Sequence, residues 1–447
     1  MRRVPPLLLS CLLLGATTAP AQAPSSTAPS STDSSGSLAL ALLPDEDGLA
    51  SLLWARSPEF STARARVASA RSDLVRAGLL PNPELELGAN TLPLGPTNPP
   101  GLNRLTEVPN FGVGLSQLIE LGKRGPRQNA ARAALASTAL EVQAQLRERT
   151  RDVLERAAEV ATVEVRLAEL ERLAGDAARL TELQRARAQR GDTSGLDADR
   201  AMLEEAQLQE QLAGERGRLS EALLECSRTV GLACEPFGAS EPAAAFLSTR
   251  LSAPPATDAL EQRPDLRALE AQQRSAQAAL TLARRRWIPD PTVQAGYLYD
   301  QFLISGNQLH SVGINLSIPL PVFDRGQADV LAASASAEAA ASTRAQLTAQ
   351  AQRDLTSLSA QRDALEARRT RVRTQTLPQA AQLVQRLEAA MRAGGASMLE
   401  LLLARRTYGQ LLLDATELDL SAFRLAVAQE RVRAGGPRAP AELSEHF

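Results

Sequence analysis

The chain has 447 residues with 49 basic and 51 acidic side chains, a formal net charge of −2. This balance removes the electrostatic argument for binding nucleic acid, which we therefore do not expect as a partner. Apart from the N-terminal leader no run of about 18 apolar residues occurs, which excludes a membrane-spanning helix but not a β-barrel, whose strands are short and half apolar.

The N-terminal segment has the layout of a secretory leader. Two arginines precede an apolar stretch at residues 7–16, and small residues follow, with a cleavage site after Ala21. We therefore interpret residues 1–21 as a signal peptide. Residues 22–40, rich in Ser, Thr, Pro, Ala and Gly, are predicted to form a flexible mature N-terminus.

The first half of the mature chain combines helical patterns with two strand patterns. Its first helical segment is stopped by Pro81 and Pro83. Its longest helical pattern has no internal proline and would extend on the order of 95 Å at 1.5 Å per residue, more than a compact domain needs. The predicted elements are helices at 58–78, 126–190 and 196–229, strands at 84–91 and 111–120, and a turn at 191–195.

The second half has the same order of elements. Pro378 interrupts its long helix and is predicted to bend that helix rather than end it. The predicted elements are helices at 264–287, 326–392 and 397–433, strands at 292–300 and 311–318, and a turn at 394–395.

Three landmarks recur in the same order about 200 residues apart, which indicates an internal duplication. They are Leu79–Gly88 with Trp287–Gly296, Leu115-Ser116 and Arg124-Gly125 with Leu316-Ser317 and Arg325-Gly326, and Ser194–Asp197 with Ser397–Glu400. The mature chain then divides into a first repeat at 41–235, a linker or equatorial segment at 236–262, a second repeat at 263–433 and a tail at 434–447.

All four strand segments alternate apolar and polar residues with period two. Their length of about 9 to 11 residues suits a tilted strand that crosses a bilayer core. A sheet cannot leave an edge in lipid and the smallest bacterial barrels have about eight strands, so several copies would share one barrel. A soluble amphipathic sheet is the alternative. Aromatic residues near the strand ends favour a membrane girdle: Phe111, Tyr297, Tyr299 and Phe302.

With these helices and strands, the chain resembles the TolC family of outer-membrane efflux channels from about residue 41 to 433. The most specific segments are 262–268, 116–124 and 318–323, and the last two are similar to the heavy-metal-efflux branch of the CzcC and CusC type. The resemblance implies an α+β membrane protein that forms a homotrimer, with four strands per chain in a shared 12-stranded β-barrel above a long α-helical barrel. It also implies a location in the outer membrane with extension into the periplasm, a periplasmic adaptor and an inner-membrane RND-type pump.

The resemblance further implies that the two helical turns form the periplasmic tip, where the adaptor docks. The residues expected to dock it are Gly191, Ser194, Gly195, Leu196, Gly395, Ser397 and Leu399. Asp197 and Glu400 occupy the acidic gate positions, and Asp199 and Arg200 would make contacts between protomers. Rings of such carboxylates favour cations. The alternative is that these acids only stabilise helix N-termini.

Two cysteines remain after the leader. Cys226 lies before and Cys234 after a helix end and a turn at Gly231, so in an oxidising compartment they would form either a local disulfide or two buried thiols. With 2 His and 4 Met in the chain, we predict no metal site, and no cofactor is expected.

The resemblance implies a passive conduit rather than an enzyme, and the sequence has no Gly-rich phosphate loop, nucleophile elbow or HExxH motif. The conduit would carry substrate, metal cations among the candidates, from the inner-membrane pump to the cell exterior. Two alternatives remain: an exit duct for drugs, peptides or proteins under another pump class, and a periplasmic coiled-coil scaffold that forms no channel.

Overall fold

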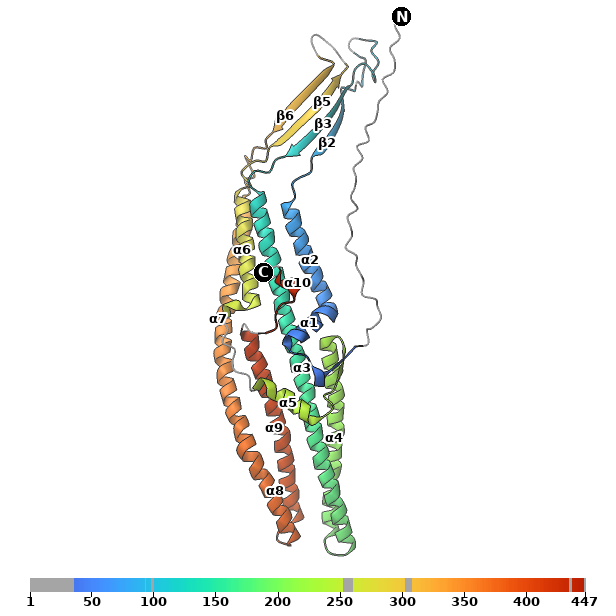
Figure 1. The fold of residues 1–447 in the computed structure, drawn as a ribbon, viewed down its shortest axis with the longest axis vertical. Coiled ribbons are helices and arrows are strands. Elements are labelled where there is room, and N and C mark those ends of the chain that lie inside the picture. The colour runs from blue at the N-terminus through green and yellow to red at the C-terminus, as the bar shows by residue number, and fades with distance from the viewer. Residues whose placement is uncertain are drawn as a thin grey trace.

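The protein is long and narrow, with a small sheet at one end of a helical body (Figure 1). The computed structural model describes residues 36–92, 94–97, 100–251, 260–301, 308–433 and 436–445. The predicted signal peptide and Phe302 lie outside these described residues. The helices predicted from the two halves are all present, and the two ends of the described chain lie near the middle of the body.

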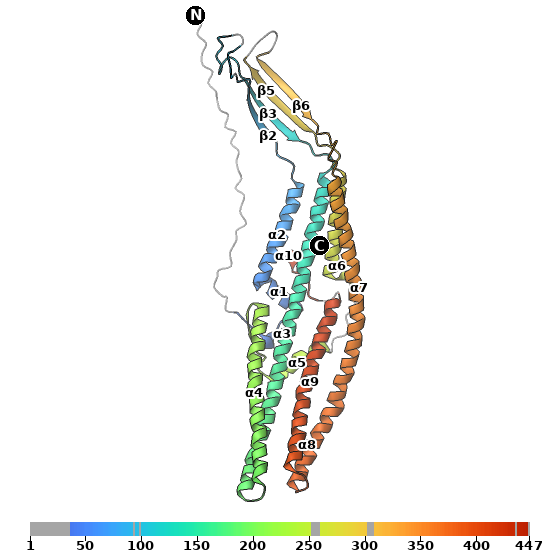
Figure 2. The ribbon, with the colours of Figure 1, turned by 180° about the vertical axis from the view of Figure 1, so that it is seen from behind.

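The helical body consists of two long hairpins that lie side by side (Figure 2). Helix α3 has 66 residues, and α4 returns beside it after a turn at Gly191, whose φ is +80°. The second hairpin turns at Gly394, whose φ is +77°. Glycine suits both turns because it adopts positive φ without steric strain. The bounds are α3 Arg124–Gln189, α4 Gly195–Val230, α7 Gln327–Arg371, α8 Leu377–Arg392 and α9 Met398–Val432.

The second long helix widens locally where the sequence places a proline. Val372–Thr376 form a π-helical segment between α7 and α8, and the Leu377 amide donates to the Val372 carbonyl. Pro378 has no amide hydrogen, and its ring would collide with a carbonyl of a regular α-helical turn, so the wider turn accommodates it. The helix continues through this point, as the sequence predicts.

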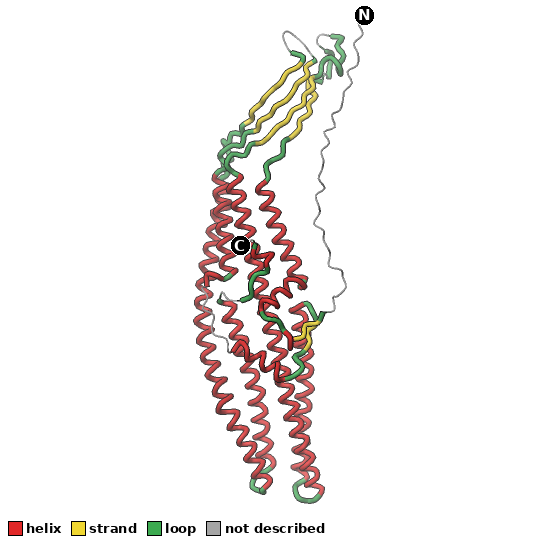
Figure 3. Tube along the Cα trace, viewed as in Figure 1, coloured by secondary structure: helices red, strands yellow, loops and turns green. Residues whose placement is uncertain are grey.

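The sheet has four antiparallel strands in the order β2-β3-β5-β6. Each half of the chain supplies one hairpin, and β3 pairs with β5 to join them. The sheet lies at the end of the helical body opposite the two helical turns (Figure 3). The strands are β2 Glu84–Asn90, β3 Asn110–Leu118, β5 Thr292–Asp300 and β6 His310–Ser317.

Short elements surround the middle of α3 and enclose the largest apolar core. Phe60, Val153 and Phe423 are completely buried there. Strand β1, at Ser37–Ala39, pairs in parallel with β4, and Leu38 is buried, so the segment predicted to be flexible up to residue 40 is ordered from residue 37. The surrounding elements are α1 Glu46–Arg56, α2 Pro58–Gly78, β4 Ala233–Glu235, α5 Ser240–Leu251 and α10 Ala441–Ser444, whereas α6 Pro264–Arg284 packs against α3 and α7 outside this core.

Candidate functional site

One face of the sheet is apolar along its whole width. Leu87, Val113, Tyr297 and Val312 lie opposite one another across the four strands, and Leu85, Leu115, Ala295 and Ile314 form the next row. Leu87 is 76% exposed and Ile314 is 75% exposed. A contiguous exposed apolar surface of this kind marks contact with lipid or with another protein.

The opposite face of the described sheet is mostly polar, with Leu118 and Leu298 as its apolar members, and contains no basic side chain. The strands contribute Glu84, Glu86 and Asp300 to this face and no Lys or Arg. Gln294 donates to Glu86 and accepts a hydrogen bond of 3.2 Å from Asn315. This face is therefore acidic and would favour cations over anions in any water-filled space that it lines.

Aromatic residues gather at the sheet end that is remote from the helices. Phe111 and Tyr299 lie opposite each other, and His310 follows Tyr299 in the same row. The His310 ring lies 5.4 Å from that of Tyr299, and its Nδ1 hydrogen-bonds the Tyr297 hydroxyl. Three of the four residues predicted for the girdle are thus together on the apolar face, while Phe302 is not described.

A largely shielded ion pair joins the two linkers that lie between the sheet and the helices. Lys123, the only lysine in the chain, places Nζ 2.7 Å from Asp290 Oδ2, and the Leu121 amide donates to Asp290 Oδ1 at 2.9 Å. The side chains of both ions are less than one-fifth exposed. This contact connects the linker after β3 to the linker before β5, and sequence analysis did not identify it.

The turn between α3 and α4 forms the first predicted tip together with the start of α4. The Ser194 hydroxyl accepts from the Leu196 amide at 3.2 Å and caps α4. Asp197 lies in the first turn of α4 and pairs with Arg200 at 3.3 Å. Within the described protomer, two residues of the predicted gate therefore bind each other.

The turn between α8 and α9 forms the second predicted tip. Ser397 and Glu400 form a reciprocal capping box: the Glu400 amide donates to the Ser397 hydroxyl, and the Ser397 amide donates to Glu400 Oε2 at 2.9 Å. These backbone and side-chain hydrogen bonds lower the pKa of Glu400. Within the described protomer Glu400 therefore caps the N-terminus of α9.

The two tips pack against each other through a small apolar cluster. Leu180 of α3, Ala201 of α4 and Met398, Leu401 and Leu402 of α9 are buried together. Beyond this cluster Arg405 of α9 pairs with Glu388 of α8 at 2.5 Å. The tip residues are therefore presented by one packed unit of four helices.

Buried carboxylates join the two helices within each hairpin further along the body. Arg166 of α3 pairs with Glu215 of α4 at 2.8 Å, and Asp419 of α9 accepts from Arg369 at 2.7 Å and from Arg373 of the π-helical segment. A cavity of about 140 Å³ lies between the hairpins on the tip side. It includes Glu204, whose pKa is raised by burial.

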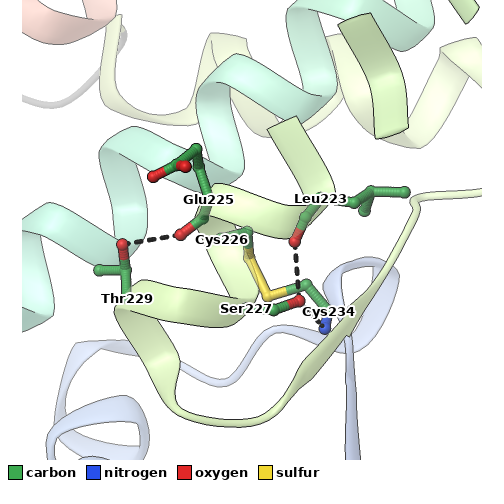
Figure 4. The surroundings of a disulfide bond; sticks show 6 residues. All are labelled: Leu223, Glu225, Cys226, Ser227, Thr229 and Cys234. Carbon is green, nitrogen blue, oxygen red and sulfur yellow. Dashed lines mark hydrogen bonds between the residues drawn. A yellow bond between two sulfur atoms is a disulfide. The ribbon is translucent and has the colours of Figure 1, made fainter. Parts of the chain in front are cut away.

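Cys226 and Cys234 form a disulfide that closes the end of α4 onto β4 (Figure 4). Between them the Ser227 hydroxyl accepts from the Cys234 amide at 2.9 Å and donates to the Leu223 carbonyl at 2.7 Å. The bond lies inside the central core, where Cys226 is completely buried. It anchors β4, and through it β1, to the helical body.

Among the described residues there is no helix both long and apolar enough to cross a bilayer. In the same ranges, no three His, Cys, Asp or Glu side chains group as metal ligands would.

The described chain thus combines two paired helical hairpins with an amphipathic antiparallel sheet at one end. Residues 49–231 and 256–433 match the outer membrane efflux protein family. The chain therefore belongs to that family, and it is an outer-membrane efflux channel rather than an enzyme.

Similar proteins of known function and structure agree with this assignment. The cobalt-zinc-cadmium resistance protein CzcC of Cupriavidus metallidurans is 29% identical over 78% of this chain and 80% of its own length. The nickel and cobalt resistance protein CnrC of the same organism is 37% identical over 100 residues, 22% of this chain and 23% of CnrC.

Solved structures share the fold at low sequence identity. CusC, described in connection with transmembrane channel formation, matches with a TM-score of 0.71 and 17% identity over 87% of this chain and 92% of that one. VceC of Vibrio cholerae matches with a TM-score of 0.68 and 19% identity over 87% and 96%.

Proposed function

We propose that three copies of the chain form a continuous duct from the periplasm to the cell exterior. Their sheets would close into a 12-stranded barrel, with the apolar face toward lipid and the acidic face toward the lumen. The observation that carries this proposal is the in-register apolar face, exposed across all four strands at the end of a helix of 66 residues. The duct would serve an inner-membrane RND-type pump through a periplasmic adaptor that docks at the helical tips.

Metal cations are the proposed cargo. The support is the similarity to CzcC and CnrC, whose names state resistance to cobalt, zinc, cadmium and nickel, and the absence of basic residues from the polar face of the described strands. The test is metal tolerance of a deletion strain, which should fall for cobalt, zinc or nickel and recover with the intact gene. Loss of tolerance to detergents or dyes alone would assign the duct to another exporter class.

The acids at the tips are proposed to narrow the periplasmic end. Three copies of Asp197 and Glu400 would form carboxylate rings that repel one another as the aperture narrows. We expect Asp197→Ala with Glu400→Ala to raise single-channel conductance in planar bilayers. Because Glu400 also caps α9, the matched variant Asp197→Asn with Glu400→Gln removes the charges while a glutamine keeps the capping box.

Both pairs of substitutions should raise conductance and lower cation selectivity if charge closes the tip. A rise in the alanine variant alone would assign the effect to fraying of α9. Unchanged conductance and selectivity in both variants would contradict the gate assignment.

A further inference from the structure

A cavity lies in the middle of the helical body, where helices from the two halves of the chain meet (Figure 1). Its walls are the middle of α3, the residues that begin α6 and the end of α9. The cavity has a volume of about 90 Å³, which is room for several water molecules. It is separate from the sheet and from the helical tips, so the proposed duct assigns it no role.

Arginines dominate the lining of this cavity. Five arginines against two acids give the lining a formal net charge of +3. Arg147 and Arg151 lie one turn apart on α3 and are almost completely buried, with 5% and 4% of their surface exposed. The other three arginines come from the start of α6 and the end of α9, and they are Arg263, Arg431 and Arg433.

The two acids of the lining are each bound to an arginine of the lining. Asp265 accepts two hydrogen bonds from Arg263, of 3.0 and 2.6 Å. Glu148 pairs with Arg431 at 3.1 Å. The excess positive charge of the lining therefore belongs to its other three arginines.

Acids near the cavity reduce this excess without removing it. Burial lowers the pKa of Arg147, and repulsion by Arg151 lowers it further, to about 10, although Asp265 and Glu46 attract the guanidinium. Burial also lowers the pKa of Arg151 against the attraction of three nearby acids. An anion in the cavity would stabilise these buried charges, because a buried cation is costly unless an opposite charge accompanies it.

The arginines differ in how firmly the structure holds them. Arg151 Nη2 donates to the Glu430 carbonyl at 2.8 Å, and Arg263 Nη1 donates to the Val432 carbonyl at 3.0 Å, so both are tied to the end of α9. Among the described residues, the side chain of Arg433 makes no hydrogen bond or ion pair. Its guanidinium is therefore available to a ligand.

We propose that this cavity binds a tetrahedral oxyanion with a double negative charge, of the class of phosphate and sulfate. The planar guanidinium group offers paired N–H donors that match such an ion, and charge-assisted hydrogen bonds are about twice as strong as neutral ones. Arg147 and Arg151 supply the buried positive charge, and Arg433 donates hydrogen bonds to the ion. The bound ion links α3 of the first half to α6 and α9 of the second.

Equilibrium dialysis of radiolabelled phosphate against the purified full-length protein in detergent tests the site. Chloride keeps the ionic strength constant, because screening alone changes the attraction between charges. We expect saturable binding of one phosphate per chain, which sulfate displaces and additional chloride does not. Absence of saturable binding, or displacement by chloride as effective as that by sulfate, would overturn the proposal.

Two substitutions with opposite expected effects locate the bound ion. Arg433→Gln should weaken phosphate binding by at least about tenfold, because it removes a charge-assisted hydrogen bond. Glu148→Gln should strengthen binding by about threefold or more, because it removes a negative charge from the lining. Arg431, the partner of Glu148, keeps Asp152 at 2.8 Å in that variant, so the packing of α3 against α9 should persist.

Arg386→Gln is the matched control, since Arg386 is exposed on α8 and does not line the cavity. Its affinity for phosphate should equal that of the wild type. An equal loss of affinity in Arg386→Gln and Arg433→Gln would assign the binding to the overall charge of the surface and overturn the site. Unchanged affinity in Arg433→Gln, or weaker binding in Glu148→Gln, would also overturn it. None of these outcomes depends on metal export or on channel conductance.

Discussion

Lys123 and Asp290 connect parts of the chain that are 167 residues apart. The pair is mostly shielded from water and Asp290 also accepts from the Leu121 amide, so its Coulombic attraction is stronger than that of a surface pair. It fixes the point at which the linkers of the two halves leave the sheet. The amino-acid composition assigns no role to a single lysine. The role of Lys123 is therefore identified only from the fold.

We predict that Lys123 and Asp290 are energetically coupled. In a double-mutant cycle with Lys123→Met and Asp290→Asn, measured by denaturant unfolding in detergent, the coupling should be about 1–3 kcal/mol. The exposed pair of Arg76 and Asp73 is the matched control and should give less than about 1 kcal/mol. Equal coupling for the two pairs would contradict a structural role for the buried one.

At the scale of elements, the sequence predicts the long helices and the four strands well. Long periodic patterns and proline or glycine boundaries give strong signals for them. It missed α1, α5, β1 and β4. The strands β1 and β4 have three residues each, too few to show a period, and they form only because the disulfide and the central core hold them together.

The capping box of α9 gives a prediction at this scale. Ser397→Ala removes the hydroxyl that accepts a hydrogen bond from the Glu400 amide. The first turn of α9 should therefore fray. We expect amide exchange there to be faster by a factor of about five, the equivalent of about 1 kcal/mol. Ser194→Ala, which removes a cap without a reciprocal glutamate, should have the smaller effect on its own helix.

Acid should act on the same box with a defined sign. Because the folded-state pKa of Glu400 is lowered, its contribution is present above the unfolded value of 4.5 and is lost as pH falls through the folded value. Amide protection in the first turn of α9, corrected for the intrinsic pH dependence of exchange, should therefore fall on acidification in the wild type and change little in Glu400→Gln, whose side chain does not titrate. An identical acid response in both proteins would contradict this assignment.

For the whole molecule, the two faces of the sheet should respond oppositely to a new charge. Leu87→Arg places a charge on the apolar face and should cost about 2–4 kcal/mol near the middle of a bilayer, so little protein should reach the outer membrane. Glu86→Arg, one residue away on the polar face, should assemble and lose cation selectivity. Quantifying trimer in outer-membrane fractions, together with reversal potentials, checks both outcomes, and equal assembly would contradict a lipid-facing apolar side.

The amino-acid sequence by itself determined the helices, the strands and the placement of acids at two turns, because each depends on local periodicity or on a short motif. Only the tertiary structure decided that β3 pairs with β5 and that Lys123 meets Asp290. It also decided that Asp419 of α9 pairs with Arg369 of α7 and with Arg373 of the π-helical segment. It also showed that Glu400 caps its own helix. Contacts between residues far apart in the chain leave no periodic signal, since burial and partner geometry are set only when the halves pack together.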